Sequence, residues 1–205
     1  MNKKRCFALV ASLAFSSGCL ADATHLSDHS PINALGKVLL IENGDKYWIQ
    51  VDAESFKHVR AVTLNNNYRS SQSVFAAHIF GLGIYDDEQD PSKFKRANFK
   101  KISELGETFY KDQEVMVYCS AVNAEGMPDC LVYRDMIDPT TKVKTPISIN
   151  ELVLDQGLAK VNRSAMTKRE QRSNMMKVVD LAESKGKASK LGVWGQHLNL
   201  LPDDF

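Results

Sequence analysis

An Asn-Gly turn between two apolar runs constrains the fold of this chain more than any other feature. The run at 36–42 (GKVLLIE) is followed by Asn43-Gly44-Asp45, and the next run, 47–51, alternates apolar and polar residues. Asn-Gly suits the left-handed turn that joins two antiparallel strands, and it is the strongest local signal for a hairpin. The sequence therefore predicts a β-hairpin, and with it an antiparallel sheet or small barrel.

A second hairpin is predicted around the turn-rich segment 123–126, with a cysteine on each side of it. Cys119 ends an apparent strand at 114–119, and Cys130 begins another at 130–133. A hairpin centred on this turn places the two cysteines opposite each other, which is the geometry of a cross-strand disulfide. Two free buried thiols are the alternative. A metal site is less favoured because no histidine lies nearby at ligand spacing.

The rest of the chain mixes helices and strands, which is typical of an α+β protein with a small antiparallel barrel or sheet. The capping-box spacing at Ser148 and Glu151 predicts a short helix that stops at Gly157. Residues 57–73 are ambiguous between a strand at 58–64 and a loop, and 138–146 is expected to be a loop. A strand is expected at 74–84. A helix is expected from about Ser92, and its buried face would carry Phe99, Ile102, Leu105 and Phe109. A last helix is expected at 168–191, and its inner side would carry Met175, Val178, Val179 and Ala182.

Residues 1–21 have the pattern of a secretory signal peptide. Lys3-Lys4-Arg5 precede a short apolar stretch at 6–15, and small residues follow it. Cleavage after Ala21 is favoured, and lipidation of Cys19 is the alternative. We therefore expect an exported protein, periplasmic or secreted, or an outer-membrane lipoprotein whose contact with the membrane is a lipid on Cys19.

Length and composition predict a single globular domain behind that signal. The chain has 205 residues, of which 43% are hydrophobic and 25% charged. Three of the 26 basic residues and none of the 25 acidic ones lie within 1–21, so the remainder is slightly acidic. Binding of nucleic acid would therefore have to be local. The expected layout is a signal peptide at 1–21, a loose segment at 22–35, one domain at 36–195 and a tail at 196–205.

The sequence resembles the micrococcal nuclease (thermonuclease) family over about 36–194. The segment 148–161 (SINELVLDQGLAKV) matches the family pattern N-x-x-L-V-x-x-G-L-A, with Val153-Leu154 in place of L-V. The closing helix ends in Gly192-Val193-Trp194, where family members carry G-[IVL]-W, and the helix at 94–109 also fits. The resemblance implies an OB fold, a five-stranded β-barrel with three helices, and it implies that Trp194 closes the core beneath the last helix.

The resemblance also implies a phosphodiesterase site with one calcium ion, two or three carboxylates and two arginines. Asp45 matches a calcium ligand of the family's first hairpin, although a turn aspartate is an equally good interpretation. The acidic turn at 85–91 offers two registers. One places Tyr85 at the second carboxylate and Glu88 at the catalytic base. The other places Asp86 at that carboxylate, but it moves Gln89 to the position of the base. A solvated acidic turn is the alternative to both.

Neither register supplies the two arginines that would grip the phosphate. Phe80 or Gly81 stands at the first position and Met127 at the second. A well-placed arginine in phosphoryl transfer is worth about 10³ to 10⁵ in rate, so we expect little turnover. Arg60 or Arg69, from the ambiguous segment, could substitute for a missing arginine.

The leading hypothesis is an exported thermonuclease-like domain with a degenerate active site, which serves as a binding or assembly module with an envelope protein as partner. This hypothesis leans against enzymatic activity and needs no cofactor. One alternative is an active Ca²⁺-dependent endonuclease on DNA or RNA that uses Asp45 and Glu88. Another is a non-catalytic nucleic-acid binder that uses the cationic segment 160–190, although such a segment is more often a solvated helix face.

Overall fold

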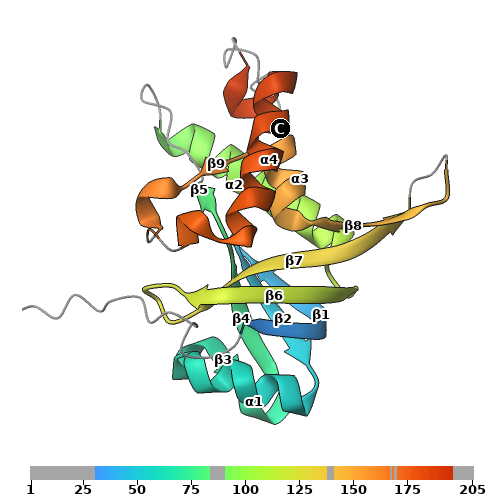
Figure 1. The fold of residues 1–205 in the computed structure, drawn as a ribbon, viewed down its shortest axis with the longest axis vertical. Coiled ribbons are helices and arrows are strands. Elements are labelled where there is room, and N and C mark those ends of the chain that lie inside the picture. The colour runs from blue at the N-terminus through green and yellow to red at the C-terminus, as the bar shows by residue number, and fades with distance from the viewer. Residues whose placement is uncertain (1–30, 84–90, 138–140, 167, 169, 196–205) are drawn as a thin grey trace, which may run out of the picture.

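The chain folds around a closed barrel of five strands. The computed structural model describes residues 31–83, 91–137, 141–166, 168 and 170–195, and at 65, 91–97 and 165 it describes the backbone alone. The barrel strands are β1 (Ile32–Glu42), β2 (Lys46–Val51), β4 (Val74–Ile79), β6 (Glu114–Val122) and β7 (Pro128–Ile137). Neighbours pair antiparallel in the order β4-β2-β1-β6-β7, and a parallel pairing of β4 with β7 closes the barrel. This is the OB topology, so the predicted α+β barrel is confirmed (Figure 1).

The predicted first hairpin is formed by β1 and β2. Asn43 and Gly44 have φ angles of 56° and 78°, the left-handed conformation that an Asn-Gly turn adopts. The first strand begins at Ile32 rather than at Gly36, because its first half pairs with β6 while its second half pairs with β2. A register shift between Val38 and Leu40 marks a bulge, and such a bulge helps a long strand to bend around a barrel.

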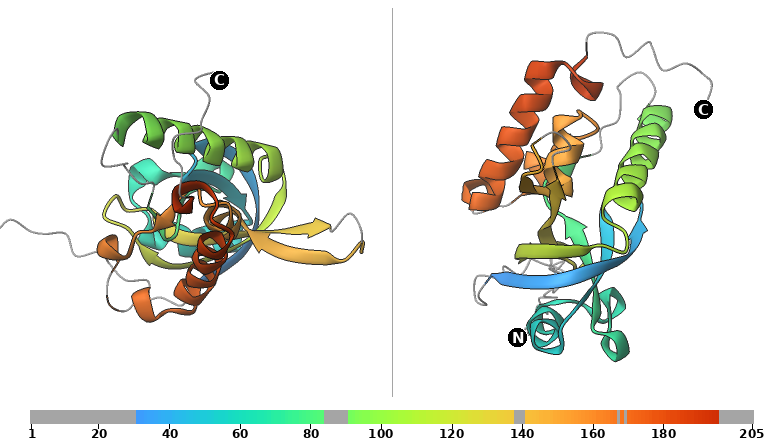
Figure 2. Two further views of the ribbon diagram at one scale, coloured as in Figure 1. Left: turned by 90° about the horizontal axis from the view of Figure 1, so that it is seen from above. Right: turned by 90° about the vertical axis from the view of Figure 1, so that its right-hand side faces the viewer.

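Helices cover both ends of the barrel. They are α1 (Ala53–Val62), α2 (Pro91–Phe109), α3 (Ile149–Asp155) and α4 (Asn174–Ser189). The first lies at one end, and the other three gather at the opposite end (Figures 1 and 2). Ile102 of α2 is fully buried as expected, whereas Phe109 is 37% exposed and the next residue, Tyr110, is buried in its place. The hydroxyl of Tyr110 donates to the carbonyl of Ile147 at 2.7 Å, which satisfies its polar group inside the core.

The ambiguous segment forms a helix, not the strand considered for 58–64. The Asp52 carboxylate accepts hydrogen bonds from the N–H groups of Glu54 and Ser55 and so caps α1. Phe56 and Val59, which are nearly one turn apart, are buried in the core. Short 3-10 turns follow at Asn65–Asn67 and Ser70–Gln72, and between them β3 (Tyr68–Arg69) pairs with β4.

Two other boundaries differ from the sequence prediction because backbone pairing overrides the local pattern. The strand expected at 74–84 ends at Ile79, since the chain turns at Gly81 with φ 83°, and β5 (Leu82–Gly83) then pairs with β9 (Lys160–Val161). Part of the loop expected at 138–146 is β8 (Lys144–Ser148), which pairs with β7 and forms the arm that projects from the barrel in Figure 1.

The carboxyl-terminal elements largely follow the sequence prediction. Ser148 and Glu151 form the predicted capping box, and Gly157 ends the turn after α3 with φ 65°. The last helix begins at Asn174 rather than at 168, behind short 3-10 turns at Arg163–Ala165 and Glu170–Arg172. Its inner residues Met175, Val179 and Ala182 are buried as expected, whereas Val178 is only partly buried.

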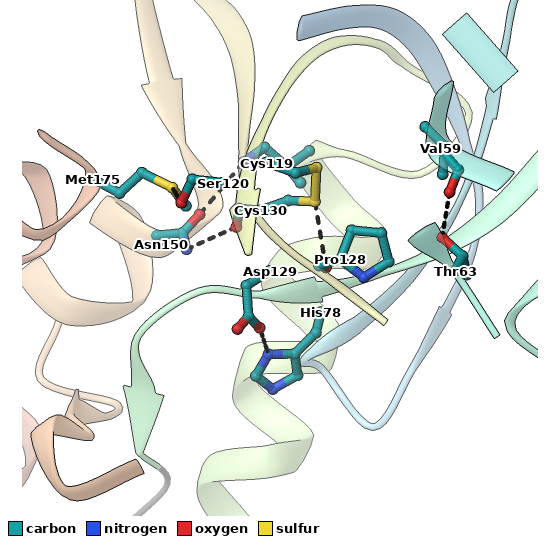
Figure 3. Close-up of a disulfide and its surroundings, with 11 residues drawn as sticks. Val59, Thr63, His78, Cys119, Ser120, Pro128, Asp129, Cys130, Asn150 and Met175 are labelled. Carbon is teal, nitrogen blue, oxygen red and sulfur yellow. Dashed lines mark hydrogen bonds and ion pairs between the residues drawn. A yellow bond between two sulfur atoms is a disulfide. The ribbon is translucent and has the colours of Figure 1, made fainter. Parts of the chain in front are cut away.

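The predicted disulfide between Cys119 and Cys130 is present. The two residues are direct partners in the β6–β7 ladder, with Cα atoms 4.1 Å apart, and both side chains are fully buried (Figure 3). The disulfide therefore links the hairpin strands inside the barrel, and the alternative of two free thiols does not hold.

Asn150 links α3 to the barrel from a fully buried position. Its side-chain amide donates to the carbonyl of Phe80 at 2.8 Å and to that of Cys130 at 3.4 Å, and its carbonyl oxygen accepts from the N–H of Val132. Figure 3 shows this amide beside the disulfide. The asparagine of the N-x-x-L-V pattern is thus a structural clamp.

The predicted signal peptide at 1–21, with Cys19 and the predicted cleavage point after Ala21, and the tail at 196–205 lie outside the described residues. Within the described part of the chain, no helix combines the length and the hydropathy needed to cross a membrane.

Candidate functional site

A pocket of about 500 Å³ opens between the β1–β2 turn and the β6–β7 turn, beside α2. Carboxylates contribute most of its charge. Among the described side chains, the acidic ones of the lining are Glu42, Asp45 and Glu125, and the basic ones are Lys46 and His78. The remaining walls come from Asn43, Asn123, Phe99 and Met127. Ligand pockets typically measure roughly 300–1,000 Å³, so this one is large enough for a side chain or a small molecule.

His78 lines the pocket and pairs with a carboxylate from the neighbouring strand. The parallel pairing of β4 with β7 sets His78 opposite Asp129, and its Nδ1 lies 2.5 Å from Oδ1 of that residue (Figure 3). Burial disfavours the charged imidazole, but the hydrogen bond and charge of Asp129, with Asp45 and Glu125 nearby, outweigh burial and raise the pKa of His78. The imidazolium therefore persists to a higher pH than that of a free histidine.

Asp45 lies at the pocket end of the first hairpin. Its backbone carbonyl accepts a hydrogen bond from Ile79 at 2.8 Å, which fixes the turn against β4. Burial raises the pKa of the Asp45 carboxyl, and the nearby His78 partly opposes this. Among the described residues, no cation lies within 4 Å of the Asp45 carboxylate. The adjacent Lys46 instead pairs with Glu42 at 3.3 Å.

The β6–β7 turn is held rigidly by its own residues. The Asn123 side chain accepts hydrogen bonds from the N–H groups of Glu125 and Met127, each at 3.0 Å. Gly126 has φ 75°, which favours glycine over any residue with a side chain. This turn therefore presents Glu125 and Met127 to the pocket in a fixed arrangement.

The segment after α1 supports this turn from behind. The N–H of Leu64 donates to the carbonyl of Gly126 at 3.0 Å, and the side chain of Asn67 donates to the carbonyl of Glu125 at 2.8 Å. A Cβ added to Gly126 would lie 2.1 Å from Leu64. The region that was ambiguous in the sequence thus braces the rim of the pocket.

No arginine side chain lines the pocket among the residues that the structure describes. Phe80, at the first position where the resemblance implies an arginine, is 1% exposed and belongs to the core, while Met127, at the second, lines the pocket. The two arginines considered as substitutes are engaged elsewhere: Arg60 stacks over Tyr68 and Arg69 over Trp48. Lys46 lies over the same tryptophan ring, 5.2 Å from its centroid.

Of the predicted site residues, only Asp45 can be placed in the pocket. Asp86 and Glu88 lie outside the described residues, so their roles as calcium ligand and base stay predictions. Within the described part of the chain, no three or more His, Cys, Asp or Glu side chains are grouped so that they could hold a metal ion. The donors that are described therefore do not by themselves fit a calcium ion.

Two carboxylates of the pocket lining, Glu42 and Glu125, were not singled out by the sequence, and neither was Asp129, which pairs with His78. His78 is the basic side chain nearest along the chain to Phe80, the position of the missing first arginine. The alternation of β4 places His78 on the same face as Ala76 and Val74, but the partnership with Asp129 depends on the parallel closure of the barrel. Only the barrel topology could have revealed this pair.

Trp194 is half-buried rather than sealed in the core. Ammonium groups of two lysines lie over its ring, Lys160 at 4.9 Å and Lys187 at 4.5 Å from the centroid. The core position expected for this residue is therefore only partly realised, and cation–π contacts cover the ring.

Comparison with known proteins shows the fold alone. No protein-family model matches the sequence, and no curated protein matches it either. Among solved structures, the extended Tudor domain of Drosophila melanogaster Tudor-SN (p100) is similar, with a TM-score of 0.51 and 10% identity over 80% of this chain and 99% of that one. The chain therefore has a nuclease-like OB fold, which is what the sequence resemblance implies for its architecture.

Proposed function

We propose that this chain is an exported binding module on a nuclease-like OB fold and that it does not hydrolyse phosphodiesters. One observation carries the proposal: the pocket presents three carboxylates and, among the described residues, no guanidinium group. Catalysis of phosphoryl transfer depends on positive charge that surrounds the phosphate in the transition state. An acidic pocket would instead surround the phosphate with negative charge.

The electrostatic cost supports this proposal. A negatively charged phosphate oxygen 4 Å from a carboxylate is repelled by about 4 kcal/mol at an effective dielectric constant near 20. Lys46 offsets little of this, because it is already paired with Glu42 and because an ammonium lacks the forked geometry of arginine. We infer that nucleic-acid backbones are excluded from the pocket.

The alternative is an active Ca²⁺-dependent nuclease. The ion and a water molecule would then have to be held by Asp45, Asp86 and Glu88. Two arginine side chains that the structure does not describe would also have to reach the pocket. Calcium would supply a Lewis acid for the phosphate oxygens. The described donors do not fit this ion.

The proposal is tested by incubating the purified protein with single-stranded DNA and CaCl₂, with and without a chelator. We expect no cleavage in either case. Chelator-sensitive cleavage that is lost in both Asp45→Ala and Glu88→Ala would overturn the proposal. Salt-dependent retention of DNA without cleavage would instead favour the alternative of a non-catalytic nucleic-acid binder.

Export and the form of the amino terminus belong to the same proposal. If residues 1–21 are a signal peptide, the mature chain begins at Asp22, and if the lipid-attachment interpretation holds, it begins at an acylated Cys19. Mass spectrometry of the protein recovered from the cell envelope distinguishes the two, and an unprocessed chain would contradict export. An envelope protein is the partner we propose.

A further inference from the structure

We propose that the pocket binds a lysine or arginine side chain that a partner protein presents. This inference rests on the proposed binding function and names the chemistry of its ligand. It concerns the whole cavity between the two turns: its volume, its unpaired charge and its apolar walls.

Among the side chains that the structure describes, the charges of the pocket do not balance. Each basic side chain in the lining already has an acidic partner, Lys46 with Glu42 and His78 with Asp129. Asp45 and Glu125 have no ion-pair partner among the described residues. Two carboxylates in one cavity, one of them partly buried, are stabilised by a cation that enters the cavity.

The walls favour an organic cation over a bare metal ion. The Phe99 ring and the Met127 thioether line the same cavity. An aromatic ring attracts ammonium and guanidinium groups, and apolar walls pack against the methylene stem behind such a group. A divalent metal instead requires several oxygen ligands around one point, and no such group occurs among the described residues.

The rim is built to receive an incoming segment without rearranging. Asn123 fixes the turn that carries Glu125, and the segment after α1 braces that turn through Leu64 and Asn67. The opposite rim is the Asn-Gly turn next to Asp45. A ligand bound between two fixed turns loses less free energy to ordering of the protein, which favours recognition of a single protruding side chain.

The test is a titration of the full chain with short capped peptides, followed by the amide resonances of pocket residues in NMR spectra. The probes are Gly-Gly-Lys-Gly-Gly, its arginine counterpart and a counterpart with norleucine, which keeps an aliphatic stem but lacks the charge. We expect the lysine and arginine peptides to produce saturable shifts at Asn43, Lys46 and Glu125. The norleucine peptide should produce none.

Charge-removing variants assign the binding to the pocket. Asp45→Asn and Glu125→Gln keep the side-chain shape, and each should weaken binding of the lysine peptide by about tenfold. Glu114→Gln, which removes one charge at the opposite end of β6, is the matched control and should leave the affinity unchanged. Dispersed spectra of each variant verify that it is folded.

Three outcomes would overturn the inference: equal binding of the norleucine peptide, unchanged affinity in both pocket variants, or saturable shifts with CaCl₂ but not with the basic peptides. The cleavage assay keeps the two proposals apart. Absence of peptide binding without DNA cleavage rejects this inference alone, whereas calcium-dependent cleavage rejects the proposed function as well.

Discussion

Asn150 illustrates how one buried side chain organises this barrel. Its amide contacts the backbone of β7 at two points and the carbonyl of Phe80. We expect Asn150→Ala to lower the free energy of unfolding by about 3 kcal/mol, because it leaves buried backbone groups without partners. Urea denaturation measures the change. Asn33→Ala, at an exposed position of β1, is the control and should change stability by less than about 0.5 kcal/mol.

His78 should make stability depend on pH. Its pKa is raised in the folded protein, so the folded state holds the proton more tightly than the unfolded chain, whose pKa is near 6.5. The stabilisation is fully present below about pH 6.5 and is lost as the pH rises through the raised pKa. His78→Gln should remove this dependence. The difference in free energy of unfolding between wild type and variant should shrink as the pH rises above about 6.5.

A difference that stays constant over this range would contradict the charge interaction with Asp129. The comparison uses both proteins at each pH so that other titrating groups contribute equally. Asp45, whose pKa is also raised, acts in the same direction at lower pH: its ionisation destabilises the folded state as the pH rises.

At the scale of single residues, the sequence predicts those features that are set by residues close together in the chain. The Asn-Gly turn, the Ser148 capping box and the Cys119–Cys130 pairing each follow from local spacing. The charge balance of the pocket does not, because His78 and Asp129 are 51 residues apart and meet only through barrel closure.

Two glycines, Gly157 after α3 and Gly192 after α4, are in close backbone contact. This contact fixes how the ends of the two helices pack. Gly157 has φ 65°, and a Cβ there would lie 2.1 Å from the carbonyl oxygen of Leu191. Gly192 likewise has φ 51° and approaches Gly157, whose carbonyl accepts from Val193 at 2.8 Å. The glycines that carry the family resemblance here are thus required by close backbone contact.

We expect Gly157→Ala to lower the Tm by about 4–8 °C, since it combines a strained φ with a backbone clash. Differential scanning calorimetry gives the change. Gly195→Ala is a matched control because its φ is negative and its nearest neighbour would lie 3.3 Å away. Equal effects of the two substitutions would show that the backbone contact between Gly157 and Gly192 does not exclude a side chain.

Among the described α-helices, α1 is the one that the sequence did not predict, and its position explains why. Its N-cap, Asp52, lies before the window in which a strand was considered, and its buried residues pack against a barrel end that no local pattern reveals. By contrast, α3 and the buried residues of α4 were predictable, because cap, periodicity and stop signal all agree within one segment.

At the scale of the whole molecule, strand order is what the sequence leaves open. Hairpins predict β1 beside β2 and β6 beside β7, but the pairing of β1 with β6 and the closure by β4 and β7 join residues far apart in the chain. The resemblance to the nuclease family supplied that topology in advance. The resemblance did not predict the side chains of the pocket, because it rests on structural positions such as Asn150 and Gly157.

The pocket's rejection of phosphodiesters is tested most directly by titrating the protein with a single-stranded oligonucleotide in the presence of CaCl₂ while following the resonances of Asp45, Lys46 and the His78 ring. We expect no saturable shift at these residues at any oligonucleotide concentration reached. A saturable shift that requires calcium and disappears with a chelator would show that the pocket holds a phosphate-bound metal, and it would contradict the binding module proposed for this chain.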